Sequence, residues 1–161
     1  MKKQIYFFNF LIFISFNFNA AGQQADAWKI TATKIDPSNY YGITVANGQI
    51  GIVSSAEAFK VKDVVLAGAY DLYGRGRVSN FLKSFNLLNI YMEIDGRRLA
   101  NNDATNMKQE LDMQHASFTT SLDYKDVATI SYTYYALRQL PYSVLMDITV
   151  TAKKDLNLGS A

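Results

Sequence analysis

The stretch ATISYTYYAL, residues Ala128–Leu137, decides the fold. Its apolar and hydroxyl-bearing side chains alternate, so that Ile130, Tyr132 and Tyr134 fall on one face of an extended segment. The opposite face carries Thr129 and the hydroxyl side chains that follow it at every second position. A period of two predicts a β-strand that is covered on one face and partly solvated on the other. In a helix the same side chains would spread around the whole circumference, and their β-branched members would disfavour it.

Short segments of the same kind recur along the chain, and no long helical pattern interrupts them. They cover residues 28–35, 41–45, 49–53, 59–70, 86–94, 108–124 and 142–152. Asn47–Gly48 and Asp95–Gly96 are dipeptides typical of tight hairpin turns, and Gly68 marks a point where a strand is expected to bend. The sequence therefore predicts an all-β fold, an antiparallel β-sandwich.

The first 22 residues form a separate segment with the layout of a secretory signal peptide. Lys2 and Lys3 precede an apolar run over residues 5–18, and Ala20 and Gly22 supply small residues for cleavage. A membrane anchor is the alternative, but polar residues interrupt the run, which is shorter than the about 20 apolar residues of a spanning helix. We expect residues 23–161 to be a periplasmic or secreted domain without stable membrane insertion.

The charge balance excludes one large class of functions. The chain has 16 Lys plus Arg against 14 Asp plus Glu, and the first 22 residues hold two lysines and no acid, so residues 23–161 carry 14 of each. A formally neutral domain lacks the clustered positive charge that nucleic acids need, so we expect no nucleic-acid partner. The sequence also contains no cysteine, so disulfides cannot stabilise it and its core must.

Several motifs in this order resemble a known family. They are TVANGQIGIVSS (residues 44–55), VVLAGAYDLYGRG (64–76), NLLNIYMEIDGRRL (86–99), QELDMQHASFTTSLDY (109–124) and VATISYTYYALRQLPYSVLMDITVTAKK (127–154). Together they look like the start of the N-terminal β-sandwich of glycoside hydrolase family 65. That family includes the maltose, trehalose and kojibiose phosphorylases and related α-glucoside hydrolases.

The resemblance implies a large sandwich of the galactose-mutarotase type, followed by a separate barrel of paired helices that carries the catalytic acid. Only KKDLNLGSA, residues 153–161, follows the last predicted strand. We therefore expect the sandwich to be incomplete and the catalytic barrel to be absent. The inward side chains of residues 142–152 would then need a facing sheet, and an open sheet favours association. A homodimer is one form that such association can take.

One segment combines an acid, an aromatic ring, glycines and positive charge. It is LAGAYDLYGRGR, residues 66–77. It lacks the lysine and the following helix of a phosphate-binding loop, so a surface loop after a strand is the better interpretation. Asp71, Tyr73 and Arg75 are the candidate substrate-binding residues, because such a loop can lean over a neighbouring barrel and contact sugar hydroxyls.

Catalytic and metal-binding residues are not evident. The acids Asp71, Glu93, Asp95, Glu110 and Asp112 fit solvated strand ends better than the facing carboxyl pair of a glycosidase. His115 is the only histidine, and no cysteine accompanies it, so we expect neither a multi-histidine metal site nor a cofactor. Without a partner to orient it, His115 is predicted to be an exposed strand residue and not a general base.

Two classes of function remain open. In the first, the chain is the N-terminal part of an exported enzyme that cleaves an α-linked glucose disaccharide or oligosaccharide bound by the missing domain. Hydrolysis is then favoured over phosphorolysis, because a sugar phosphate formed outside the cell does not enter metabolism directly. In the second, the chain is a free-standing carbohydrate-binding or interaction module, which exposed aromatic rings would favour.

The signal-peptide interpretation predicts cleavage near Gly22. Mass spectrometry of the protein from an exporting cell should show a mature N-terminus at or near Gln23, in a soluble periplasmic or secreted fraction. An intact Met1 in the membrane fraction would refute this prediction.

Overall fold

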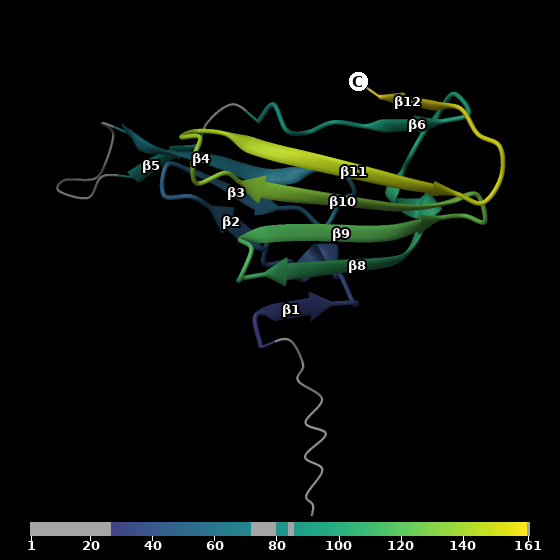
Figure 1. Ribbon diagram of the computed structural model, residues 1–161, viewed down its shortest axis with the longest axis horizontal. Helices are drawn as coiled ribbons and strands as arrows, with labels where there is room; N and C mark the ends of the chain where they lie inside the picture. The colour runs from purple at the N-terminus through teal and green to yellow at the C-terminus, as the bar shows by residue number, and fades with distance from the viewer. Residues whose placement is uncertain (1–26, 72–79, 84–85, 161) are drawn as a thin grey trace, which may run out of the picture.

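The computed structural model describes residues 27–71, 80–83 and 86–160 (Figure 1). The predicted signal peptide lies outside these residues. The described part is all-β, with antiparallel strands and two short 3-10 helices, η1 (Pro37–Asn39) and η2 (Asn101–Asp103). None of its helices is long and apolar enough to cross a membrane. The predicted fold class, an antiparallel β-sandwich, is confirmed.

The larger sheet has five strands in the order β1-β8-β9-β10-β11 (Figure 1). These are β1 (Lys29–Ala32), β8 (Ala104–Asp112), β9 (Ser117–Tyr124), β10 (Ala128–Ala136) and β11 (Val144–Ala152). In the register of the sheet, Ile130 of β10 lies opposite Leu122 of β9 and Val150 of β11. The deciding stretch of sequence is therefore a strand with paired neighbours on both sides.

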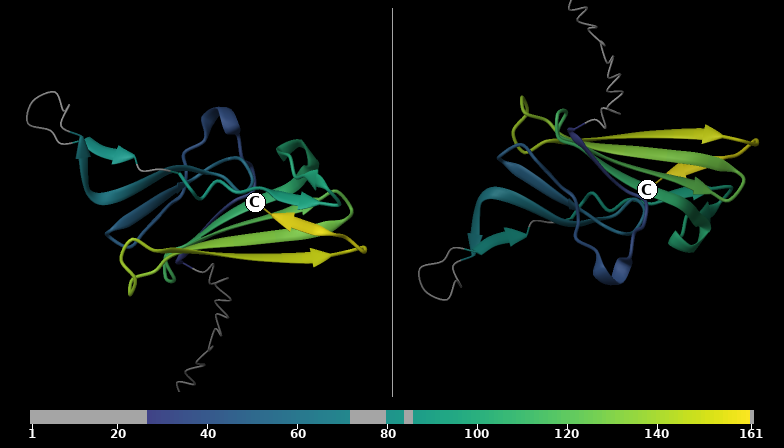
Figure 2. Two further views of the ribbon diagram at one scale, coloured as in Figure 1. Left: turned by 90° about the horizontal axis from the view of Figure 1, so that it is seen from above. Right: turned by 90° about the horizontal axis from the view of Figure 1, so that it is seen from below.

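The second sheet has four strands in the order β2-β3-β4-β5, and a small third sheet has the order β12-β6-β7. The bounds are β2 (Thr44–Ala46), β3 (Ile50–Ser54), β4 (Val61–Asp71), β5 (Asn80–Lys83), β6 (Met92–Ile94), β7 (Arg97–Arg98) and β12 (Leu158–Ser160). Figure 2 shows the four-stranded and five-stranded sheets as separate layers. Apolar side chains of both sheets form one buried cluster between them.

The burial of β10 follows the alternation of its sequence. Ile130, Tyr132 and Tyr134 are at most 1% exposed, whereas the residues between them are half-buried. They pack with Ile52 of the facing sheet in the common core. Burial of each such side chain contributes about 1.5–3 kcal/mol to the free energy of folding, so this strand is a main source of stability.

A contact between Tyr132 and Phe59 joins the β10 strand to the turn that follows β3. The two rings are stacked with centroids 4.5 Å apart, and the backbone N–H of Phe59 donates to the Tyr132 hydroxyl at 3.0 Å. Phe59 has a φ of 59°, a left-handed conformation that is unfavourable for a bulky residue. The buried stack and hydrogen bond hold this conformation in place.

A second link between the layers is polar. Gln109 points inward from β8, where only 1% of its surface is exposed. Its Oε1 accepts from the Tyr40 hydroxyl at 2.7 Å, and its Nε2 donates to the Ser55 carbonyl at 2.9 Å. The Tyr40 hydroxyl also lies 2.6 Å from the Ser54 Oγ. Because these groups satisfy one another, the buried amide is tolerated in an apolar core.

The predicted turns are confirmed. Asn47 accepts the N–H groups of Gln49 and Ile50 on its side-chain oxygen, both at 2.9 Å, and Gly48 has a φ of 90° between β2 and β3. Asp95 and Gly96 have φ values of 52° and 70° between β6 and β7. Gly68 has a φ of 84° inside β4, in the part of the strand where the register with β5 shifts.

Three details of the strand prediction are wrong. Residues 108–124 are not one run, because a turn at residues 113–116 separates β8 from β9. His115 lies in that turn and not in a strand. Of residues 86–94, only Met92–Ile94 forms a strand; the side chains of Asn86 and Asn89 instead bond the backbone of Val61. Alternating polarity could not distinguish a strand from these side-chain-bonded loops.

At the edge of the larger sheet, β11 has β10 on one side and no described strand on the other. Its inward side chains, Val144, Met146, Ile148 and Val150, are only half-buried, whereas those of β10 are buried. The facing layer thus covers β11 less completely than β10. That the sandwich is incomplete, and that a homodimer forms at this edge, both stay predictions.

We predict that Tyr132→Phe lowers stability, because it keeps the stacked ring but leaves the buried Phe59 N–H without its acceptor. The expected loss in the free energy of unfolding is about 1–3 kcal/mol, the cost of an unsatisfied buried donor. Urea unfolding followed by circular dichroism measures it. The control is Tyr135→Phe, on the outward face of the same strand, which should change stability little; equal effects of the two substitutions would contradict the assignment.

Candidate functional site

Of the three predicted substrate-binding residues, only Asp71 lies within the described part of the chain. Asp71 is the last residue of β4, and its backbone lies opposite Asn80 of β5. Tyr73 and Arg75 fall outside the described residues. Their joint contact with a sugar therefore stays a prediction.

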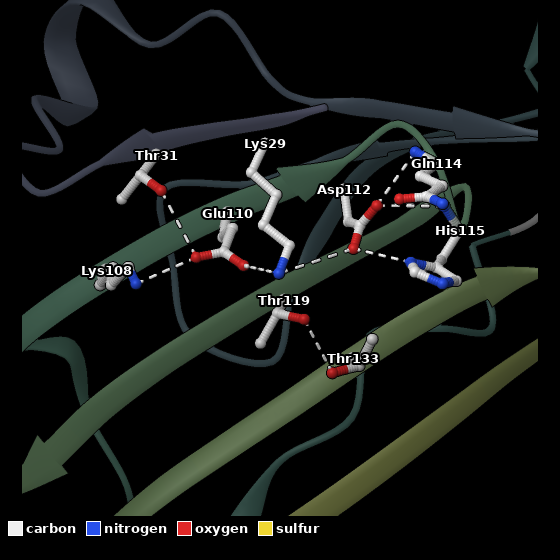
Figure 3. Close-up of polar contacts among 9 residues, drawn as sticks. All are labelled: Lys29, Thr31, Lys108, Glu110, Asp112, Gln114, His115, Thr119 and Thr133. Atoms are coloured by element: carbon white, nitrogen blue, oxygen red, sulfur yellow. Dashed lines mark hydrogen bonds and ion pairs between the residues drawn. The ribbon is translucent and has the colours of Figure 1, made fainter. Parts of the chain in front are cut away.

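A group of charged side chains lies on the outer face of β1 and β8 and on the turn that follows β8 (Figure 3). We call it the ionic cluster; its members are Lys29, Lys108, Glu110, Asp112 and His115. The Lys29 Nζ lies 3.9 Å from a carboxylate oxygen of both Glu110 and Asp112, and the Lys108 Nζ lies 3.0 Å from Glu110. Alternate residues of a strand share a face, which is why the two acids of β8 meet one lysine of β1.

His115 is oriented by Asp112, contrary to the expectation that it has no partner. Its Nδ1 lies 2.9 Å from the Asp112 Oδ2, while the Oδ1 accepts the backbone N–H groups of Gln114 and His115, both at 3.0 Å. These hydrogen bonds, the one from the His115 ring first, hold the pKa of the Asp112 carboxyl below its usual value. An aspartate three residues before a histidine, at the end of a strand, was the available sequence signal.

The ionic cluster does not have the properties of a glycosidase pair. A general acid needs a raised pKa, whereas that of Asp112 is lowered and Glu110 is paired with two lysines. The imidazole is 67% exposed, so no enclosure excludes water from it. Within the described residues, no group of three or more potential metal ligands occurs. The cluster instead neutralises the outer face of the sheet.

Hydroxyl groups cover the neighbouring part of this outer face. The hydroxyls of Thr119 and Thr133 lie 2.9 Å apart across β9 and β10 (Figure 3). Further along, Asp123 of β9 accepts from the side chains of Asn106 at 2.9 Å, Thr129 at 2.6 Å and Lys153 at 3.4 Å. The hydrogen bonds from Asn106 and Thr129, with that of Lys153, lower the pKa of Asp123 to about 2. This carboxylate therefore links β9 to the neighbouring strands β8 and β10 by hydrogen bonds.

The comparisons with known proteins give a consistent result. No known family profile matches the chain. The chain is similar to two proteins named kojibiose hydrolase. One, from Mucilaginibacter mallensis, is 69% identical over 136 residues, which are 84% of this chain and 20% of the relative. The other, from Flavobacterium johnsoniae, is 48% identical over 159 residues, which are 99% of this chain and 23% of the relative.

The chain thus spans about a fifth of the length of these relatives. Homology to proteins named kojibiose hydrolase agrees with the resemblance of the sequence motifs to a family of glycoside hydrolases. The predicted absence of catalytic residues concerns this segment alone.

We predict that Thr129→Val raises the pKa of Asp123 from about 2 toward the ordinary value, because it removes the 2.6 Å hydrogen bond to the carboxylate. The folded-state pKa lies below that of the unfolded chain, about 3.9. The stabilisation by Asp123 is therefore complete above about pH 4 and is lost as the pH falls through about 2.

Carboxyl carbon chemical shifts, measured by NMR during an acid titration, give the pKa directly. The matched control is Thr133→Val, which removes a hydroxyl from the same face of β10 without touching Asp123. An unchanged pKa in Thr129→Val would show that this hydroxyl does not stabilise the charged carboxylate.

Proposed function

We propose that this chain is the N-terminal β-sandwich of an exported enzyme of the glycoside hydrolase family 65 type, and that it supports a separate catalytic domain. The observation that carries the proposal is the 69% identity to the M. mallensis kojibiose hydrolase over 84% of the chain. The substrate of the whole enzyme is an α-glucoside disaccharide of the kojibiose type. The motif order, from TVANGQIGIVSS to VATISYTYYAL, supports the same assignment.

Hydrolysis is the proposed reaction, in preference to phosphorolysis. Both relatives are named as hydrolases. The predicted signal peptide supports this choice, because an exported enzyme has no metabolic use for a sugar phosphate outside the cell. In such a reaction the acid that protonates the leaving oxygen and the group that activates water face each other across the glycosidic bond. The proposal assigns both groups to the catalytic domain.

A supporting role suits the physical character of the described part. Its core is continuous between two sheets, its charged outer face is neutralised by the ionic cluster, and its carboxylates Asp112 and Asp123 have lowered pKa values. Groups in this state are poor proton donors at neutral pH. They fix the shape of a surface and do not perform acid–base chemistry on it.

Exposed aromatic rings favour a second candidate, a carbohydrate-binding module. Trp28 is 55% exposed and Tyr41 is 89% exposed. Flat aromatic faces stack on the apolar faces of sugars, so these rings are the specific observation for this alternative. The two functions are compatible in one polypeptide, but only the first accounts for the similarity to the hydrolases.

The first proposal predicts that the chain alone releases no glucose from kojibiose, with or without phosphate, because it assigns the catalytic pair to the separate domain. A chimera in which the chain replaces the matching segment of the M. mallensis relative should hydrolyse kojibiose with a kcat/KM close to that of the relative. Glucose release is measured in a coupled assay. The same relative without the segment is the control and should be inactive or insoluble.

Two outcomes would contradict the proposal. The first is turnover by the chain alone that disappears in Glu110→Gln, because it would place catalysis on the outer face. The second is a soluble chimera that binds kojibiose but does not hydrolyse it, because it would show that the chain cannot support the catalytic domain.

A further inference from the structure

A polar groove runs along the side of the molecule where β7 leads into η2. It consists of two adjoining hollows that share Asn101 and Asn102. The first has a volume of about 430 Å³ and includes Glu57, Lys60 and Arg98 in its wall. The second has a volume of about 480 Å³ and is lined by residues such as Thr33, Pro37, Asn106 and Met107. Volumes of this size are typical of small-molecule sites.

The fold holds the two walls of the groove together. The Asn101 Oδ1 accepts the backbone N–H of Ala58 at 3.0 Å, which ties η2 to the turn after β3. The next residue of that turn is Phe59, whose ring and N–H are fixed by Tyr132 in the core. Ala58 and Leu99 are each 8% exposed and give the first hollow an apolar floor. The groove is therefore built on anchored backbone.

Arg98 is positioned in this groove by an aromatic ring. Its guanidinium carbon lies 4.2 Å from the centroid of the Tyr91 ring, a cation–π contact that holds the planar group against the ring face. Within the described residues, no hydrogen bond or ion pair uses its N–H donors. Stacking leaves the edge of a guanidinium available to a ligand, because its donors lie in the plane of the group.

The side chains of Glu57 and Lys60 line the same hollow, and neither the carboxylate nor the ammonium group pairs with the other or with another described residue, although the Lys60 backbone N–H donates to the Glu57 carbonyl. The hollow thus presents unused donors on Lys60 and Arg98, an unused acceptor on Glu57, and the amide of Asn102, which both donates and accepts. An inorganic anion would be repelled by the carboxylate, and an apolar ligand would leave these groups desolvated and unpaired. Vicinal hydroxyl groups match this combination of donors and acceptors, since each hydroxyl both donates and accepts a hydrogen bond.

We propose that this groove binds a neutral oligosaccharide, with sugar hydroxyls on Arg98, Lys60 and Glu57 and sugar C–H groups over Ala58 and Leu99. Two adjoining hollows provide room for more than one sugar unit. The site takes part in binding only, and it does not require the hydrolysis proposed above. Binding by the chain and hydrolysis by the chimera are measured separately, so either can fail without the other.

The test titrates the ¹⁵N-labelled chain with kojibiose and, in a parallel experiment, with glucose. We expect chemical-shift changes confined to the amides of residues 57–60 and 98–102 and of the second hollow, with kojibiose binding more tightly than glucose. Arg98→Met and Lys60→Met should each weaken binding about tenfold, the effect of losing one hydrogen bond to a charged group. The matched control is Arg97→Met, which removes the neighbouring charge of β7 outside the groove and should leave affinity unchanged.

The substitution Tyr91→Leu tests whether the Tyr91 ring positions the Arg98 guanidinium or only contributes to folding. It should weaken kojibiose binding in the wild-type chain but have no further effect in the Arg98→Met variant, because the ring acts through the guanidinium. A merely structural role would give the same loss in both backgrounds. The proposal is overturned if kojibiose leaves the groove amides unchanged, if Arg97→Met weakens binding as much as Arg98→Met, or if inorganic phosphate binds there and kojibiose does not.

Discussion

The contact between Phe59 and Tyr132 is the constraint on which the rest of the structure depends. Tyr132 occupies the centre of the inward row of β10, and its ring and hydroxyl together hold Phe59 in a left-handed conformation. The turn that carries Phe59 leads from β3 into β4. The contact therefore fixes the position of this turn, and with it the start of β4, against the five-stranded sheet. The same segment carries Glu57 and Lys60, so the contact in the core also fixes the position of one wall of the polar groove.

The outer face of the larger sheet has a different physical character. Its charged groups are paired within the molecule, as in the ionic cluster and around Asp123, and hydrogen bonds lower the pKa values of the Asp112 and Asp123 carboxyls. In the groove, by contrast, Arg98 is held by a ring and not by an acid. A surface whose charges are internally satisfied suits a supporting layer, whereas unused donors and acceptors in a hollow suit a ligand.

The two proposals assign one of these surfaces to each of the two functions that the sequence left open. The similarity to kojibiose hydrolases supports the proposed place in a carbohydrate-cleaving enzyme, and the groove is the surface that we propose for sugar binding. A sandwich that supports a catalytic domain and also holds part of a sugar chain would increase the local concentration of substrate. The physical requirement is only that the two surfaces be fixed relative to one another, which a close-packed core provides.

The sequence by itself determined the fold class, the hairpins at Asn47–Gly48 and Asp95–Gly96, and the inward face of β10, because alternation and turn chemistry are local properties of the chain. It did not reveal the turn at residues 113–116 or the partner of His115, since Asp112 acts there through side-chain hydrogen bonds to the backbone. The sequence did not reveal the groove either, because Glu57 and Arg98 are far apart in sequence and line one hollow only when the turn after β3 and strand β7 lie side by side. Tertiary structure decided these features because each depends on contacts between segments whose spacing no local pattern encodes.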